Sequence, residues 1–449
     1  MNLRVIPAVL AACIAMTPAT ISAAPGDAAS PTVENRNGTT IVRQPDARSS
    51  LVGIVLVVHA GLDRQTMKQN GLSALVAQTI LRTPVTLPSK GEAATMPLEA
   101  AVAANGGSVR FTIDPGDVRL YVESLAADAP AVVALVRQAL TAPDFSSATV
   151  RDARSALTHD LAQSAQHSRY ALQVGLDMLS QASSAQANAG LPALGTATSL
   201  AQLVPADAAA FYRAYYRRGG AFVSAAGRLD ALGADALASL ADALPAGTTV
   251  PVTVRVPALL GSSREIVAHR DITSPWLIAQ YPAPSVDSGD FGPMLVLSAF
   301  VRRTLAEIAQ VPGAVSPTFA SSAVGADYSY DRAPAHLVLY VNGAIGNPTR
   351  EFATALSIVN VLAATRLQGS IDEFKAEAAG DFATGATTLE TRAWLAAVFA
   401  RGSASPDFLA RALRAIAATT PEDVQRVARR YLGNPTIALV LPRDGSPQN

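Results

Sequence analysis

Cysteine, excess charge of either sign and aromatic residues are all scarce in this chain of 449 residues. Cys13 is the only cysteine, so disulfides within the chain and thiolate clusters for a metal are excluded. Lys+Arg and Asp+Glu both number 35 and aromatic residues make up 5%, which argues against binding of nucleic acid or an anionic membrane. Hydrophobic residues make up 49%, enough for large cores. The length favours two domains.

The N-terminus has the pattern of a signal peptide over residues 1–24. Arg4 gives a short positive region, an apolar run follows to Met16, and small residues lie near Ala23. We expect export, most simply to a bacterial periplasm. A lipoprotein attached through Cys13 and an uncleaved anchor are the alternatives. No later run is apolar for about 18 residues, so we expect no transmembrane span in the mature chain.

Hydrophobic periodicity predicts an α+β fold. We expect a buried strand at 51–58, a helix over 70–81, and a hairpin with strands at 108–114 and 117–124. Further helices are predicted at 98–104, 131–140, 146–166 and from Pro205, and a loop or weak helix end at 180–190. Because strands come mostly as hairpins followed by helices, we predict a mixed, largely antiparallel sheet covered by helices on one face.

The pattern then repeats. Tyr121 and Tyr340 occupy matching strands about 219 residues apart, and Pro205 and Pro421 begin matching helices about 216 residues apart. The near-constant offset predicts a tandem repeat of two similar α/β-sandwich domains. The expected divisions are a flexible leader at 25–40, a first domain at 41–245, a linker at 246–262 and a second domain at 263–449.

Several segments resemble the insulinase/pitrilysin-type zinc metallopeptidases in that family's order. They are Asn70-Gly71-Leu72-Ser73, Asn105-Gly106-Gly107-Ser108, Leu194-Gly195-Thr196, Gly227-Arg228-Leu229-Asp230 and Thr420-Pro421-Glu422-Asp423. The resemblance implies a clamshell of two domains around a cavity, a hairpin on which peptide lies, and zinc-dependent peptide cleavage in active members.

Active relatives carry His-x-x-Glu-His, whose two imidazoles bind zinc and whose Glu is the general base. The matching positions here are Ala74, Ala77 and Gln78. The family's distal Glu ligand comes from a later helix, which here carries Arg151, Asp152, Arg154 and Asp160 and no Glu. We therefore expect no zinc or other cofactor and no catalytic residue.

The five histidines offer no substitute site. None of His59, His159, His167, His269 and His336 pairs with another at helical spacing for one metal, so we interpret them as surface or locally hydrogen-bonded groups. In the second domain the resemblance implies an Arg and a Tyr that hold the substrate backbone. Ala306 and Val315 stand at those positions, and Arg302, Arg303 and Tyr328 are the candidates to replace them. The alternative for these three is an ordinary helix face and strand pair.

Three functions remain open. The favoured hypothesis is a noncatalytic envelope subunit that pairs with an active homologous metallopeptidase and helps to hold peptide substrate. The second is a stand-alone peptide-binding scaffold, as a monomer or homodimer. The third is an active metalloendopeptidase with an atypical site.

Overall fold

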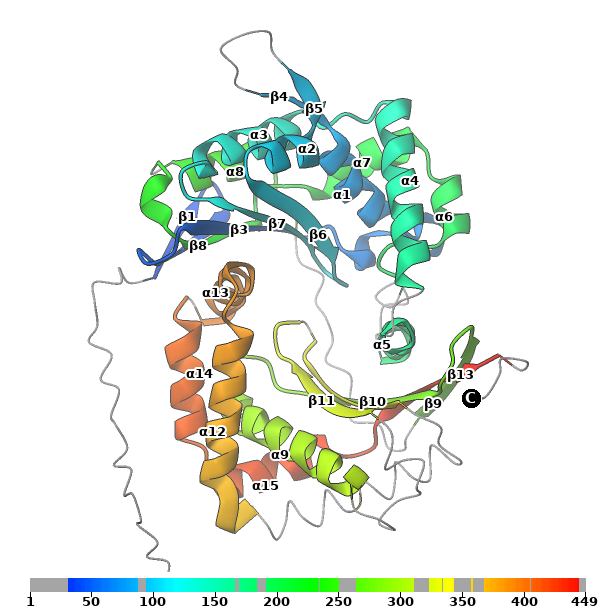
Figure 1. Ribbon diagram of the computed structural model, residues 1–449, viewed down its shortest axis with the longest axis vertical. Helices are drawn as coiled ribbons and strands as arrows, with labels where there is room; N and C mark the ends of the chain where they lie inside the picture. The colour runs from blue at the N-terminus through cyan, green and yellow to red at the C-terminus, as the bar shows by residue number, and fades with distance from the viewer. Residues whose placement is uncertain are drawn as a thin grey trace, which may run out of the picture.

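The computed structural model describes residues 31–87, 94–165, 169–183, 191–233, 235–249, 264–310, 323–332, 334–342, 367–403 and 405–443, together with residue 357. Two β-sheets lie at its centre, each with a layer of helices on its outer side (Figure 1). None of the helices in these ranges combines the length and apolar character needed to cross a membrane.

Within the described residues, the first sheet has six strands in the order β1-β2-β8-β3-β7-β6. Their bounds are Thr32–Arg36 (β1), Thr39–Pro45 (β2), Leu51–Val58 (β3), Gly107–Ile113 (β6), Val118–Leu125 (β7) and Phe222–Gly227 (β8). Strands β2 and β8 run parallel, and every other pair in the sheet is antiparallel. Strand β3 is buried at every residue after Leu51, as expected for its β-branched run.

In the part of the second half that the structure describes, five strands form a sheet in the order β11-β12-β10-β13-β9, which matches the first sheet read from β6 to β2. They span Arg264–Arg270 (β9), Trp276–Pro282 (β10), Ala323–Ser329 (β11), His336–Asn342 (β12) and Thr436–Pro442 (β13). Its single parallel pair, β9 with β13, corresponds to β2 with β8. Tyr121 and Tyr340 lie in the corresponding strands β7 and β12. The predicted mixed α/β fold with two sheet-containing halves is confirmed.

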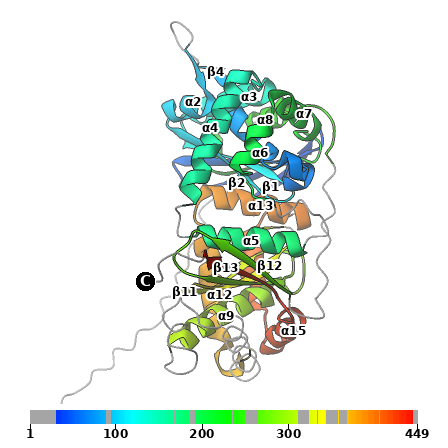
Figure 2. The ribbon, with the colours of Figure 1, turned by 90° about the vertical axis from the view of Figure 1, so that its right-hand side faces the viewer.

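Helices cover the outer face of each sheet (Figure 2). Those of the first half are Leu72–Arg82 (α1), Leu98–Ala104 (α2), Ala129–Thr141 (α3), Ser147–Ser164 (α4), Ala197–Gln202 (α6), Pro205–Tyr215 (α7) and Ala236–Ala243 (α8). Those of the second half are Phe291–Gln310 (α9), Leu367–Gly385 (α12), Phe408–Ala417 (α14) and Pro421–Tyr431 (α15). A small two-stranded sheet, Pro84–Thr86 (β4) with Thr95–Pro97 (β5), extends from the first half.

The two halves exchange one helix each. Helix α5 (Tyr170–Ser183) belongs to the first half by sequence but packs on β10 and β13 of the second sheet. Helix α13 (Leu389–Ser403) belongs to the second half but packs on β2, β3 and β8 of the first. Both helices therefore lie between the sheets (Figure 2).

This exchange corrects the expectation that helices cover only one face of each sheet. The inner faces are also apolar, with Val55 and Val57 on the first sheet and Ile278 and Val440 on the second, so each needs a cover. Helix α5 covers the inner face of the second sheet, and the sequence pattern does not predict this separate helix before residue 180. The predicted weak helix end at 180–190 falls partly on α5, which ends at Ser183, and residues 184–190 lie outside the described ranges.

The predicted flexible leader at 25–40 also needs correction, because its residues 32–36 form β1. Asn37 and Gly38 have φ of 53° and 84°, the left-handed conformations of a tight hairpin turn, so the chain folds back and β1 pairs with β2. The predicted signal segment 1–24 and residues 250–262 of the predicted linker lie outside the described residues.

Candidate functional site

Helix α1 carries the three positions where the resemblance places a zinc motif. It begins after Gly71, whose φ of 91° is left-handed. The Gln65 side chain accepts a hydrogen bond from the Ser73 N–H (3.1 Å), and Ser73 Oγ donates to the Ala60 carbonyl (2.5 Å). These bonds fix the first turn of the helix against the chain that follows β3.

Two of the three motif positions are part of the core. Ala74 is fully buried, and Ala77, 2% exposed, faces a small apolar space together with Ile80, Val118 and Leu120. Alanine has no donor atom, so neither position can hold a metal or move a proton. A carboxylate at position 77 would stand against apolar side chains.

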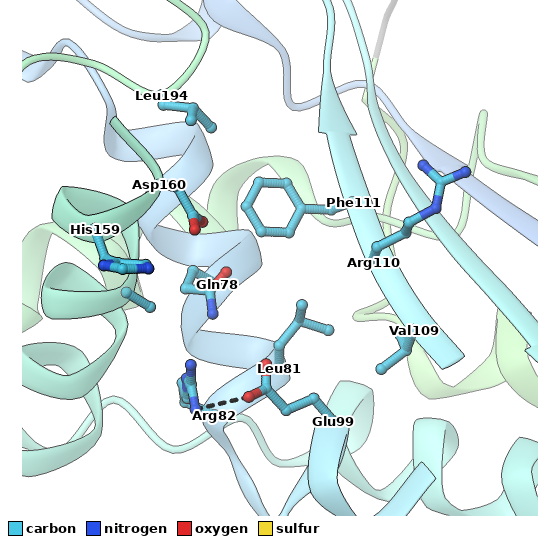
Figure 3. Close-up of a pocket in the computed structure, with 11 residues that line it drawn as sticks. Gln78, Leu81, Arg82, Glu99, Val109, Arg110, Phe111, His159, Asp160 and Leu194 are labelled. Atoms are coloured by element: carbon cyan, nitrogen blue, oxygen red, sulfur yellow. Dashed lines mark ion pairs between the residues drawn. The ribbon is translucent and has the colours of Figure 1, made fainter. Parts of the chain in front are cut away.

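The third position opens into a cavity. Gln78 is 5% exposed, and its amide points into a space of about 610 Å³ between α1, α4 and β6 (Figure 3). We call this space the α1–α4 cavity. Its lining residues are Gln78, Leu81, Arg82, Glu99, Val109, Arg110, Phe111, Ala156, His159, Asp160 and Leu194. It lies where the resemblance places the catalytic centre of active relatives.

Helix α4 brings His159 and Asp160 to the rim of this cavity. The other polar residues noted on this helix point elsewhere: Arg151 and Asp152 are exposed, and Arg154 donates to the Leu203 carbonyl (2.6 Å). The sequence alone predicts a surface or local role for His159 and gives no sign that it lies near the same cavity as Gln78. The proximity depends on how α4 packs on α1, which hydrophobic spacing within either helix does not reveal.

Two arginines beside the cavity are already paired. Arg82 Nη1 lies 2.7 Å from Glu99 Oε1 (Figure 3). Arg110 forms an ion pair with Glu390 of α13, and its guanidinium lies 4.9 Å from the centre of the Tyr121 ring. The described residues hold no group of three or more His, Cys, Asp or Glu side chains placed to bind one metal ion.

A second polar cluster lies beyond the end of β3. His59 Nδ1 is 2.6 Å from Asp117 Oδ1, and Arg401 of α13 donates to Asp117 Oδ2 (3.1 Å). Burial opposes ionisation of Asp117, but the His59 hydrogen bond and the Arg401 charge outweigh it and hold the pKa of that carboxyl below its ordinary value. Nearby, burial raises the pKa of Asp63 to about 6, with Arg64 opposing the shift. This cluster ties α13 to the first half.

The three candidates in the second half make contacts within that half. Arg302 pairs with Glu377 (3.0 Å) and Asp381, and Arg303 pairs with Glu373 and Glu377, all on α12. Tyr328 is 5% exposed, and its hydroxyl donates to the Pro284 carbonyl. None of the three lines the α1–α4 cavity. Their role in substrate contact stays a prediction, and Val315 lies outside the described residues.

Comparison with known proteins agrees with this architecture. Residues 40–197 match the model of the insulinase family, Peptidase family M16. The solved peptidase M16 inactive domain from Pseudomonas fluorescens has a TM-score of 0.72 at 14% identity, with 93% of this chain and 99% of that one covered. A protease from Helicobacter pylori also gives 0.72 at 14% identity, covering 92% and 100%.

A chain of complex III2 from Candida albicans gives a TM-score of 0.70 at 14% identity, covering 91% of this chain and 94% of that one. No curated protein matches the sequence. The family model covers the part of the first half that contains α1 and α4, and the structural likeness covers both halves. Residues 40–197 are therefore similar to the insulinase family, and the structural likeness, at 14% identity, shows that the chain shares the fold of these solved structures over both halves.

Proposed function

We propose that this chain is a noncatalytic insulinase-like protein that binds extended peptides and acts as the partner subunit of an active zinc metallopeptidase. The main support for the proposal is the set of side chains at the three motif positions of α1. The helix keeps its place beside α4 and β6, but Ala74 and Ala77 are packed into the core and Gln78 is the only motif position that faces the cavity. An amide alone cannot replace two imidazoles and a carboxylate.

Peptide binding is supported by β6, which is the last strand of the first sheet among the described residues. An edge strand offers unpaired N–H and C=O groups to which an extended peptide can add as a further strand. Val109 and Phe111 of β6 line the α1–α4 cavity, so a peptide added here would run along its mouth. This arrangement binds a peptide backbone without any metal.

The partner role is supported by likeness to an inactive domain and to a chain of a multi-subunit complex. The test is affinity purification of the tagged protein from its native host under mild conditions, followed by mass spectrometry. A homologue with His-x-x-Glu-His should co-purify in stoichiometric amount. Recovery of the chain alone would contradict the partner role and favour the stand-alone scaffold, which predicts peptide binding by the isolated monomer or homodimer.

The proposed site of action is the bacterial periplasm, after removal of residues 1–24. Osmotic shock should release the protein with a mature N-terminus close to residue 25. Recovery in the cytoplasmic fraction with Met1 intact would contradict export, and lipid attached to Cys13 would favour the lipoprotein alternative.

The alternative of an active enzyme makes a distinct prediction. Purified protein would contain stoichiometric metal, and a chelator would stop its cleavage of peptides. We expect metal-free protein and no chelator-sensitive cleavage.

A further inference from the structure

One polar side chain of helix α1, Gln78, faces the α1–α4 cavity. Gln78 is 5% exposed and has no hydrogen-bond partner within the described part of the chain, although its amide points into the cavity (Figure 3). An amide that faces a cavity in this way can form hydrogen bonds to water or to a ligand. Its carbonyl oxygen is thus available as an acceptor for a group that enters the cavity.

A carboxylate lines the same cavity as this amide. Asp160 reaches the cavity from α4 and lines it together with Gln78 and Phe111 (Figure 3). No ion pair to Asp160 occurs among the residues that the structure describes. The nearby cations are engaged, since Arg82 is held by Glu99 and Arg110 by Glu390. The cavity therefore has one unneutralised carboxylate.

The remaining walls suit the stem and the head of a long cation. Leu81, Val109 and Leu194 provide apolar surface for methylene groups, and the Phe111 ring offers a π face to a positive charge. A guanidinium or ammonium group would find a carboxylate, an amide oxygen and an aromatic ring together. A purely apolar side chain would leave Gln78 and Asp160 without partners.

The geometry of β6 indicates how such a side chain would arrive. Val109 and Phe111 alternate along the strand and point to the same face, toward α1 and α4. A peptide added to the free edge of β6 continues the sheet, so every second side chain of that peptide points to this same face. One of them would then lie at the cavity.

We propose that the α1–α4 cavity is a specificity pocket for an arginine or lysine side chain of a peptide bound along β6. This assignment rests on the proposed peptide-binding function. In this assignment, the place where active relatives carry the zinc motif recognises a side chain of the peptide. Asp160 provides the negative charge, Gln78 a hydrogen-bond acceptor and Phe111 an aromatic face.

Fluorescence anisotropy with labelled peptides of about ten residues tests the assignment. The peptides are identical except for a central Arg, Lys, citrulline or Leu, where citrulline keeps the shape of Arg without its charge. We expect the Arg and Lys peptides to bind about three- to ten-fold more tightly than the citrulline peptide, as suits a pair at a partly exposed rim. Asp160→Asn should remove this difference, so that the Arg and Lys peptides bind no more tightly than the citrulline peptide.

Asp152→Asn is the matched control, because Asp152 lies on the same helix with its side chain 68% exposed and does not line the cavity. It should bind all four peptides like the parent protein. Equal binding of the four peptides by the parent protein, or a charge preference that persists in Asp160→Asn, would overturn the pocket assignment alone. Failure of every peptide to bind would overturn the proposed peptide-binding function and the pocket with it.

Discussion

Gly71 and Gly195 lie back to back at the entrance to helix α1. A Cβ atom placed on Gly195 would be 2.7 Å from Gly71 Cα, and one placed on Gly71 would be 3.0 Å from Gly195 Cα. Both residues have left-handed backbones, with φ of 79° and 91°. This contact fixes the start of α1 against the loop that precedes α6, and so sets the position of Gln78 and of the α1–α4 cavity.

Replacement of Gly195 by Ala should destabilise the protein by about 1–3 kcal/mol, through the left-handed strain and the clash with Gly71. Urea unfolding monitored by circular dichroism gives the midpoint for each variant. The control variant is Gly289→Ala, where an added Cβ meets nothing within 4 Å. The control should retain the parent midpoint. Equal midpoints for the two variants would contradict the close approach of the two glycines.

Installing the family's motif should not restore catalysis. In the triple variant Ala74→His, Ala77→Glu, Gln78→His we expect no chelator-sensitive peptide cleavage, because the distal Glu is also missing from α4. The structure adds a second reason: position 77 faces Val118 and Leu120, which would keep a carboxyl uncharged and crowd the core. The measurements are metal content and peptide cleavage with and without a chelator. Chelator-sensitive activity would show that another α4 group, such as Asp160, completes the site.

Local patterns predicted much of this fold. The run at 51–58 coincides with β3, and the spacing over 70–81 differs from α1 by one or two residues at its ends, because alternation and helical periodicity are properties of a single element. The tight turn at Asn37-Gly38 also has a sequence signal, because an Asn-Gly pair between β-prone residues predicts a hairpin turn. The composition of residues 25–40, taken alone, predicts a flexible leader instead.

No such sequence signal predicts that α5 and α13 each cover the sheet of the other half. None predicts which residues line the α1–α4 cavity. An apolar helix surface does not indicate which sheet it covers, and α13 is apolar on two sides: Trp394 and Ala397 face the first sheet, while Leu395 and Phe399 join the second core. Likewise, Gln78 and Asp160 come together only through the packing of two helices distant in sequence. The resemblance to the family identifies the positions that correspond to its zinc motif. Which residues surround those positions depends on tertiary packing, which the sequence pattern does not reveal.

Asp63 should make stability depend on pH. Its side chain is 4% exposed, and burial raises its pKa from 3.8 to about 6. Because the folded state binds the proton more tightly than the unfolded state does, this group favours the fold most below pH 4, and the contribution is lost as pH rises through 6. Asp63→Asn should therefore raise the unfolding free energy at pH 7.5 by up to about 3 kcal/mol relative to the parent, with little difference at pH 4.

Urea unfolding of both proteins from pH 4 to 8 measures this difference. Asp152→Asn is again the control, because its exposed side chain should give parallel curves at every pH. Parallel curves for Asp63→Asn would mean that Asp63 is ionised in the fold at little cost, with Arg64 compensating for its burial.

Trp394 should link the stability of the two halves. It lies on α13 at 6% exposure, with the Arg119 guanidinium of β7 4.2 Å from the centre of its ring, and its Nε1 donates to Asp331 Oδ2 (3.0 Å). Trp394→Ala removes a buried aromatic side chain and should cost about 3–5 kcal/mol. Since α13 covers β3 and β8, amide hydrogen exchange should accelerate in those strands of the first half as well as in α13 itself.

The matched control is Leu413→Ala on α14, whose side chain is exposed and should leave exchange in both sheets unchanged. Acceleration confined to the second half in Trp394→Ala would contradict the helix exchange, because each sheet would then be stabilised by its own half alone. Acceleration in β3 and β8 would mean instead that the first sheet, and with it the strand β6 to which we propose peptide binds, depends on a helix supplied by the second half.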